Sequence, residues 1–231
     1  MSRIFITGDT HGDYDWHKFA TRNFPEQKNL TKDDYVIIAG DFGGVFSLDK
    51  TDKYIQKIYN GRNFTTLFID GNHENHDALD AYPVEEWHGG KIHKIADSVF
   101  HLMRGQVFEI GGKTFFTMGG AESTDRQYRK EGKSWWAREM PSIEEYEEAY
   151  VNLEKHGGEV DYIITHCAPE PTLCALKMPH LYFRSSNELT EFFDTLAQTI
   201  RFRDWYFGHY HDDSDLGNFH MLYRRIIELK D

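Results

Sequence analysis

Residues 65–74 read TTLFIDGNHE, a short apolar run that ends in an acid and continues into the tetrapeptide GNHE. The β-rich run predicts a buried strand over Thr65–Asp70. Asn72 and His73 directly after it are either polar residues of an ordinary turn or two functional groups held at one point. The second interpretation requires partners elsewhere in the chain.

The same arrangement recurs at four other places, where a predicted buried strand stops at a residue type that binds metal ions. These strands are predicted over Arg3–Thr7, Tyr35–Ala39, Asp161–Thr165 and Asp204–Phe207. The residues that follow them are Asp9 and His11, Asp41, His166, and His209 and His211. Ligands of open α/β sheets bind outside the carboxyl ends of the strands, so side chains at a shared edge would converge. Each segment alone is typical of a turn or a structural histidine, but five in order favour one common site.

The segments between the strands predict helices, and the alternation predicts one α/β domain. Helices are predicted over about 14–23, over Asp52–Asn60 with Gly61 as its cap, from a capping box at Ser142, and from 185–188. Their apolar stripes would be Tyr54, Ile55, Ile58 and Tyr59; Ile143, Tyr146, Tyr150 and Leu153; and Leu189, Phe192, Phe193, Leu196 and Ile200. An antiparallel insertion with its turn at 111–112 is predicted from strands over Val99–Met103, Gln106–Ile110 and Lys113–Met118. Strand-like segments over 219–223 and 226–229 follow.

Composition limits the class of protein. The chain has 231 residues, 39% of them hydrophobic, which suits a single domain over residues 1–231. No apolar run approaches the ~20 residues of a membrane span, and the first residues lack the sections of a signal peptide. We therefore expect a cytoplasmic protein without a membrane partner. The net charge of −12 opposes binding to long nucleic acid. Cys167 and Cys174 fit no zinc or redox spacing and are predicted to be small buried hydrophobes.

The five motifs together resemble the calcineurin-like metallophosphoesterase superfamily. They are D-x-H at Asp9, G-D-x-x-G at Asp41, G-N-H-E at Asn72, the strand-end His166, and G-H-x-H at His209. They extend from residue 9 to residue 211, which is nearly the whole chain. The resemblance implies an α/β fold in which two β-sheets form a sandwich flanked by helices. It also implies a metal-dependent phosphoric ester hydrolase.

The resemblance further implies a site with two metal ions. The ligands would be Asp9, His11 and His211 for the first ion, Asn72, His166 and His209 for the second, and Asp41 for both. This mixture of ligands suits transition metals, so we expect Mn, with Fe, Ni or Zn as alternatives. The expected reaction is in-line attack on phosphorus by a hydroxide that bridges the two ions. His73 would stand beside the ions without binding them and would donate a proton or a hydrogen bond to the leaving oxygen.

The second motif departs from the protein Ser/Thr phosphatase branch, which reads G-D-x-x-D-R-G. This chain has GDFGGV at residues 40–45, so the acid that orients the histidine and the arginine that grips phosphate are both missing there. A phosphoprotein phosphatase is therefore disfavoured. Asp70 and Glu74 are the candidate acids for supporting His73 instead.

The polar stretch over about 120–140 is the predicted substrate-contacting loop. Arg126 and Arg129 lie in it and are predicted to contact phosphate. Trp135, with its neighbour Trp136, either stacks on a base or plugs the core, and both interpretations have equal weight. The other histidines have no assigned role: His76, predicted to be exposed at a helix start, and His17, His88, His93, His101, His156, His180 and His220.

These features predict a metal-dependent phosphoesterase that hydrolyses a nucleotide-like or other small phosphoester. Two alternatives use the same motifs, namely a nuclease of the superfamily and a non-catalytic metal-binding scaffold. The double-strand-break nucleases usually carry further DNA-binding and dimer-forming regions, and a long polyanion suits this net charge poorly. A scaffold is disfavoured because no expected ligand position is lost.

Overall fold

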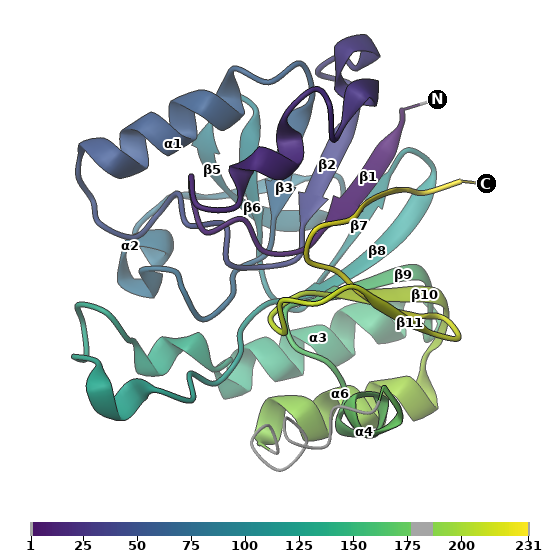
Figure 1. The fold of residues 1–231 in the computed structure, drawn as a ribbon. Coiled ribbons are helices and arrows are strands. Elements are labelled where there is room, and N and C mark those ends of the chain that lie inside the picture. Colours follow the sequence, from purple (N-terminus) through teal and green to yellow (C-terminus); the bar gives the residue numbers. More distant parts are fainter. Residues whose placement is uncertain (1, 177–186, 231) are drawn as a thin grey trace.

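The computed structural model describes residues 2–176 and 187–230. Within this part of the chain the strands form two sheets that face each other, with helices on both outer sides (Figure 1). The layers therefore run helix, sheet, sheet, helix. This arrangement confirms the predicted α/β sandwich of two sheets flanked by helices.

The first sheet has the strand order β13-β1-β2-β3-β6-β5-β4. Its strands are β1 (Ile4–Thr7), β2 (Tyr35–Ile38), β3 (Thr65–Phe68), β4 (Val84–Trp87), β5 (Gly90–Ala96), β6 (Val99–Leu102) and β13 (Ile226–Glu228). The central strands β1, β2, β3 and β6 run parallel, so their carboxyl ends share one edge. The outer strands join through antiparallel pairs.

The second sheet has the strand order β11-β12-β10-β9-β8-β7. Its strands are β7 (Gln106–Ile110), β8 (Lys113–Met118), β9 (Glu159–Thr165), β10 (Arg201–Phe207), β11 (Ser214–Leu216) and β12 (Phe219–Met221). Strands β8, β9, β10 and β12 run parallel, and β7 and β11 flank them in antiparallel pairs. The carboxyl ends of β9 and β10 therefore also share an edge.

Three buried clusters of apolar side chains separate the four layers. The cluster between the sheets contains Ile37 and Leu67 from the first sheet and Ile164 from the second. Successive residues of a strand alternate between clusters, so Val36 packs on the helical side while Ile37 packs between the sheets. Because both faces of the central strands are buried, their sequences are continuous apolar runs rather than alternating ones.

Four of the five described α-helices begin at side chains that satisfy their first free N–H groups, and the fifth begins at Pro169 without such a cap. The helices are α1 (Lys50–Asn60), α2 (His76–Asp80), α3 (Ile143–Lys155), α4 (Glu170–Ala175) and α6 (Glu188–Thr199). Asp49 caps α1, Asn75 caps α2, and capping boxes start α3 at Ser142 and α6 at Asn187. Helices α1 and α2 cover the first sheet, and α3, α4 and α6 cover the second (Figure 1). Among these described helices, none has the length and apolarity to cross a membrane.

The predicted helix over 14–23 is wrong. The chain forms only a 3-10 turn over Trp16–Phe19, followed by a second one over Pro25–Asn29. Lys18 points inward, where its ammonium donates to the backbone carbonyl of Asp9 at 2.6 Å. Pro25 also disfavours a helical conformation of the residue before it. The predicted start of α6 at Ser185 and Ser186 and the unassigned His180 lie outside the described residues.

The three strands predicted over 99–118 and the hairpin turn at 111–112 are confirmed, but these strands do not form one antiparallel insertion. Strand β6 joins the first sheet in parallel with β3, and β7 and β8 belong to the second sheet. The hairpin of β4 and β5 escaped prediction because β4 reads VEEW and is mostly exposed, so it carries no buried apolar alternation.

The predicted apolar stripes of two helices are partly wrong. In α1, Tyr54 is exposed, whereas Asp52 is buried because it accepts N–H groups from residues 46–48. In α3, Ile143 is exposed and Ala149 contributes the buried contact in its place. Both helices pack through a narrower face than the sequence pattern suggests.

Candidate metal centre

Five strand ends bring the motif residues to one place. Strands β1, β2 and β3 of the first sheet and β9 and β10 of the second end there. Glycines make the close approach possible, because a Cβ at Gly40 would lie 2.0 Å from Nδ1 of His166. A Cβ at Gly208 would likewise lie 2.2 Å from Oδ1 of Asp9. Any larger residue at these positions would displace a site residue.

Four non-glycine residues of the site adopt the left-handed backbone conformation. The angle φ is 42° at His11, 48° at Asp41, 68° at His209 and 53° at His211. Such conformations cost about 1–3 kcal/mol each and persist where the surrounding structure demands them. The strain is therefore concentrated on residues that the sequence predicts as metal ligands.

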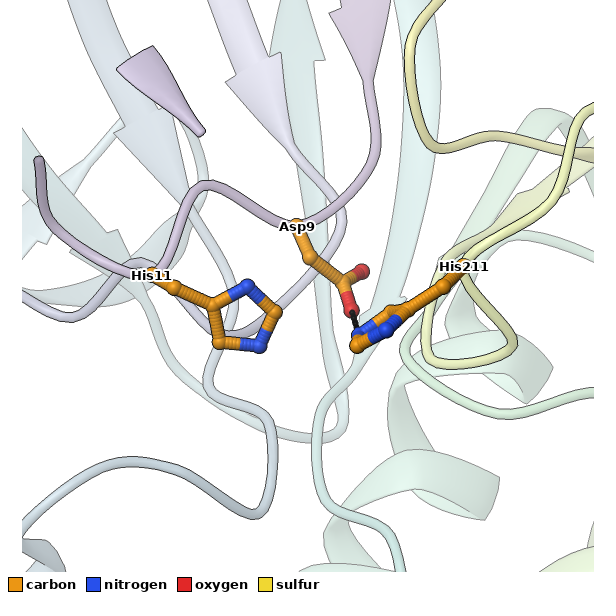
Figure 2. Close-up of side chains that lie close together, drawn as sticks. All are labelled: Asp9, His11 and His211. Atoms are coloured by element: carbon orange, nitrogen blue, oxygen red, sulfur yellow. Dashed lines mark ion pairs between the residues drawn. The ribbon is translucent and has the colours of Figure 1, made fainter. Parts of the chain in front are cut away.

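Asp9 lies between the imidazoles of His11 and His211, which come from the loops after β1 and β10 (Figure 2). Oδ1 of Asp9 accepts the backbone N–H of His209 at 2.9 Å. Oδ2 is buried, lies 3.1 Å from Nε2 of His211 and accepts no hydrogen bond. Nδ1 of His11 is 2.8 Å from Oδ2 of Asp15, which orients the ring and leaves Nε2 for a ligand. This set fits a divalent cation.

His166 faces Asn72 and Asp41 in a second group. Its Nδ1 donates to the carbonyl of Ala39 at 2.8 Å, so Nε2 is left as an acceptor. That nitrogen lies 3.3 Å from Oδ1 of Asn72 and 3.4 Å from Oδ2 of Asp41. Three acceptor atoms in such contact repel one another unless a proton or a cation lies among them. The ring of His209 packs 4.9 Å from that of His166, between centroids.

Asp41 connects the two groups, since its Oδ2 is also 3.3 Å from Nε2 of His11. Burial disfavours charged imidazoles, but the acceptor groups around them, Asp41 foremost, together outweigh it and raise the pKa of His166 to about 10 and that of His11 to about 9. In the metal-free protein, protons therefore stand where cations would. Within the described residues, the ion-pair partners of Asp9 and Asp41 are histidines rather than Lys or Arg. The residues thus fit two divalent ions, and their roles as ligands stay predictions.

His73 reaches the same place from the end of β3. Its backbone N–H donates to Oδ1 of Asp41 at 2.8 Å, and its ring centroid is 5.6 Å from that of His11. The guanidinium of Arg129 lies against the ring, with Nη1 3.3 Å from Nδ1 and Nη2 3.5 Å from Nε2. Burial and the charge of Arg129 lower the pKa of His73, against the opposing effect of Asp41. The imidazole is therefore held near a cation and near the candidate ligands.

The two acids considered as supports for His73 serve other contacts. Asp70 pairs with Arg104 next to the site. Glu74 accepts N–H groups from two glycine loops, at 3.2 and 2.6 Å, and burial raises its pKa to about 8. The partner of the His73 ring within the described chain is Arg129 instead.

Arg129 of the 120–140 loop contacts the site, whereas the two tryptophans of that loop contact other residues. Arg126 pairs with a neighbouring carboxylate at 2.9 Å and lies over the ring of Trp135, 6.0 Å from the centroid. Trp136 is buried and donates to Asp77 at 3.0 Å. The core interpretation therefore holds for Trp136, whereas substrate contacts of Arg126, Arg129 and Trp135 stay predictions.

Two predicted exposures are wrong. His76 starts α2 as expected, but it is buried because α2 packs onto the first sheet near Asp70. Cys167 is buried as predicted, whereas Cys174 in α4 is exposed.

Several residues that hold the site together were not predicted from the sequence. Asp15 orients His11 and accepts the hydroxyl of Tyr223 at 2.8 Å. Its only sequence signal is a spacing of four residues from His11. Ser123 and Glu139 stand behind Asn72 and lie far from it in sequence, so no local pattern marks them.

Comparisons with known proteins agree with this geometry. The family model described as calcineurin-like phosphoesterase matches residues 2–213. A lariat debranching enzyme from Schizosaccharomyces pombe is 26% identical over 185 residues, which are 72% of this chain and 37% of that protein. The chain thus spans well under half the length of that relative. Because the family match extends over nearly the whole chain, the protein belongs to the calcineurin-like phosphoesterase family.

Proposed function

We propose that the protein is a phosphoesterase that uses two divalent metal ions to hydrolyse a nucleotide-like or other small phosphoester. The observation that carries the proposal is the convergence of acceptor side chains at five strand ends, where no described lysine or arginine forms an ion pair with the carboxylate of Asp9 or Asp41. Two carboxylates, an amide oxygen and four imidazoles meet there in the described chain. Such a site attracts cations, and the cations would attract an anionic substrate.

The proposed ligand sets are those of the family resemblance. Asp41 would serve both ions, and the remaining ligands would be Asp9, His11 and His211 on one side and Asn72, His166 and His209 on the other. When bound, the ions would polarise the phosphoryl group and supply a nucleophile from water at neutral pH. Manganese is our first choice, and iron, nickel or zinc suit the same donors. Two carboxylates against two divalent ions leave a local charge of about +2 in an otherwise acidic protein.

His73 and Arg129 would act on the substrate itself. His73 would donate to the leaving oxygen, because its ring stands beside the candidate ligands and His11. Arg129 would add a charge-assisted contact to the phosphoryl oxygens from the loop that covers the site. It would thereby replace the arginine that is missing from the GDFGGV segment.

A cleft of about 220 Å³ opens beside His11 and His73. Phe46, Ser47 and Thr51 also line it. An aromatic ring and two hydroxyls suit a base or a sugar, which supports a nucleotide-like leaving group. None of the described lining residues is a lysine or an arginine, so a second phosphate in this cleft would lack a cationic partner.

A nuclease is the second candidate function. It is favoured by the 26% identity to a protein named as a lariat debranching enzyme. Only 37% of that protein is matched, and the net charge of −12 opposes binding of a long polyanion. We therefore place a small phosphoester first.

The test uses the full chain after removal of metal with EDTA and reconstitution with Mn²⁺. Metal content is measured, and hydrolysis of bis(p-nitrophenyl) phosphate, p-nitrophenyl phosphate and a short labelled oligonucleotide is compared. We expect two ions per chain and turnover of a small ester that EDTA abolishes. Turnover of the diester alone would define a phosphodiesterase, and preferential cleavage of the oligonucleotide would favour the nuclease. Bound metal without any turnover would point to the scaffold.

Arg129 has its own test beside Arg126. We expect Arg129→Ala to raise KM, because it lies against His73 and loses a phosphate contact there. Arg126→Ala should have the smaller effect, because its guanidinium is already engaged by a carboxylate and by Trp135. An unchanged KM in the double variant on every ester tested would remove both residues from the substrate site.

A further inference from the structure

The side-chain amide of Asn72 has two different ends, and only its oxygen can bind a metal ion. Asn72 is 6% exposed, and its Nδ2 donates to Oγ of Ser123 at 3.1 Å. Its Oδ1 points the opposite way and lies 3.3 Å from Nε2 of His166. The amide orientation that turns its oxygen towards His166 therefore depends on which hydrogen bonds Ser123 accepts and donates.

Ser123 is itself fixed by a buried carboxylate. Its hydroxyl donates to Oε2 of Glu139 at 2.7 Å, and its backbone N–H donates to Oε1 at 2.8 Å. Ser123 is 2% exposed and Glu139 is 1% exposed, so water does not compete for these contacts. Both oxygens of Glu139 face Ser123, one towards its backbone N–H and one towards its hydroxyl, so the single hydroxyl proton of Ser123 is directed to Glu139. The serine oxygen then has only lone pairs left for Asn72.

The hydrogen bonds are all donated in one direction, from Asn72 to Ser123 and from Ser123 to Glu139. Because Oγ of Ser123 offers only lone pairs, Asn72 must turn its NH₂ group towards it. The amide oxygen must then turn towards His166 and Asp41. We propose that Ser123 and Glu139 are positioning residues that hold the amide oxygen of Asn72 on the second metal ion. The inference rests on the proposed two-metal function.

The same contacts connect the metal centre to the 120–140 loop. Ser123 and Glu139 stand at the two ends of that loop, and the loop carries Arg129 between them. The Glu139–Ser123 pair therefore closes the base of the loop while it orients Asn72. Partners that orient ligands in this way typically change metal affinity by about 10–100-fold when they are removed.

The experiment measures metal binding without substrate. Metal-free protein is titrated with Mn²⁺ by calorimetry, and Co²⁺ absorption reports the geometry of the bound ions. We expect Ser123→Ala to weaken the second ion by about 10–100-fold and to leave the first unchanged. Ser134→Ala is the matched control, because this serine is in the same loop but its Oγ accepts only the N–H of Lys130.

Glu139→Gln provides an independent variant of nearly the same size. The glutamine amide would donate to Oγ of Ser123 and free the hydroxyl proton to face Asn72, which reverses the direction of the bonds. We expect the same selective weakening of the second ion. This variant decides the matter should Ser123→Ala fail to fold.

A double-mutant cycle separates positioning from general support of the loop. In the Asn72→Ala background, Ser123→Ala should cause no further loss of metal affinity, because its effect acts through Asn72. Equal and additive losses would overturn the inference, and so would two ions bound as tightly by Ser123→Ala and Glu139→Gln as by the wild type. A wild-type protein that binds fewer than two ions would instead contradict the proposed function.

Discussion

Two buried clusters of acids and histidines lie next to the end of β3, and only one of them suits a metal ion. The first is the candidate metal centre around Asp9 and Asp41. The second, the Arg104 cluster, consists of Asp70, His76, His93, His101 and Arg104. Gly71 alone separates Asp70 from Asn72, so the two clusters are adjacent along the chain.

The two clusters differ in whether the protein supplies its own cation. Oδ2 of Asp70 accepts from Nε and Nη2 of Arg104 at 2.9 and 2.5 Å, and its Oδ1 is 3.1 Å from Nε2 of His101. Burial alone would raise the pKa of Asp70, but Arg104, together with His101 and His76, outweighs it and holds that pKa well below its usual range. Asp9 and Asp41 have only histidines as described ion-pair partners. An excess of acceptors over protein cations, rather than residue type, therefore distinguishes the candidate metal site.

Removal of a carboxylate from the metal centre should give the largest effect. Asp41→Asn removes the negative charge between the two proposed ions, so we expect at least one ion to be lost. We expect kcat/KM to fall by more than the ~10²–10⁴ that a general acid supplies, because the nucleophile is lost as well. Metal analysis and steady-state kinetics check both outcomes.

The same variant should also lose stabilisation by metal. A ligand that binds only the folded state raises its stability, so Mn²⁺ should raise the Tm of the wild type more than that of Asp41→Asn. A variant that retains two ions and wild-type turnover would show that Asp41 is a structural acid like Asp70.

His73 tests whether position in the metal centre implies metal binding. We expect His73→Ala to keep both ions and to lose ~10²–10⁴ in kcat, because it removes a proton or hydrogen-bond donor and not a ligand. The measurement is metal content per chain beside kcat for the same preparation. A parallel fall of metal content and activity would make His73 a ligand or a structural residue instead.

Removal of the cation from the Arg104 cluster should act on folding. Arg104→Met leaves Asp70 buried without its partner, and breaking a buried pair in this way costs about 3–5 kcal/mol. Urea unfolding of the metal-free variant measures the change. The double variant Arg104→Met, Asp70→Asn should recover most of it, since no unpaired charge remains. A double variant no more stable than the single one would show that the pair is not balanced as the contacts suggest.

The convergence of the candidate metal ligands was predictable because these residues lie at the ends of short apolar strands. Each strand is buried on both faces, so the sequence shows a continuous apolar run and then a sudden polar residue. Asp9, Asp41 and His166 could be placed on this basis alone. The strand ends converge as expected because β1, β2 and β3 run parallel, as do β9 and β10.

The partners of these residues were not predictable, because tertiary folding brings them from distant segments. Ser123 is 51 residues from Asn72, and Glu139 is 16 residues from Ser123, so neither distance matches a helix or strand period. His93 and His101 lie opposite each other in the antiparallel pair of β5 and β6. Strand β5 was not predicted from the sequence, so the contact between His93 and His101 could not be foreseen.

The smallest predicted effect is a difference in pH dependence between the two clusters of the metal-free protein. Burial, with a contribution from His101, lowers the pKa of His93 to about 4, below the ~6.5 of an unfolded histidine. Between these values the unfolded chain binds a proton that the folded chain refuses, so stability falls as pH falls from about 6.5 to about 4. For His11, the surrounding acids, Asp41 foremost, together outweigh burial and raise the pKa to about 9. Its contribution is complete below about pH 6.5 and is lost as pH rises through about 9.

The pH dependence of stability that each histidine contributes can be removed separately. Urea unfolding in EDTA from pH 4 to pH 10 should show that His93→Asn flattens the acid side of the stability curve. His11→Asn should flatten its alkaline side. Each substitution should change the free energy of unfolding by about 1–3 kcal/mol across the affected pH range. Curves of both variants that run parallel to the wild type would remove these histidines as the cause. Mn²⁺ should abolish the contribution of His11 to the pH dependence of stability and leave the contribution of His93 unchanged. The reason is that only the metal centre exchanges its protons for a cation.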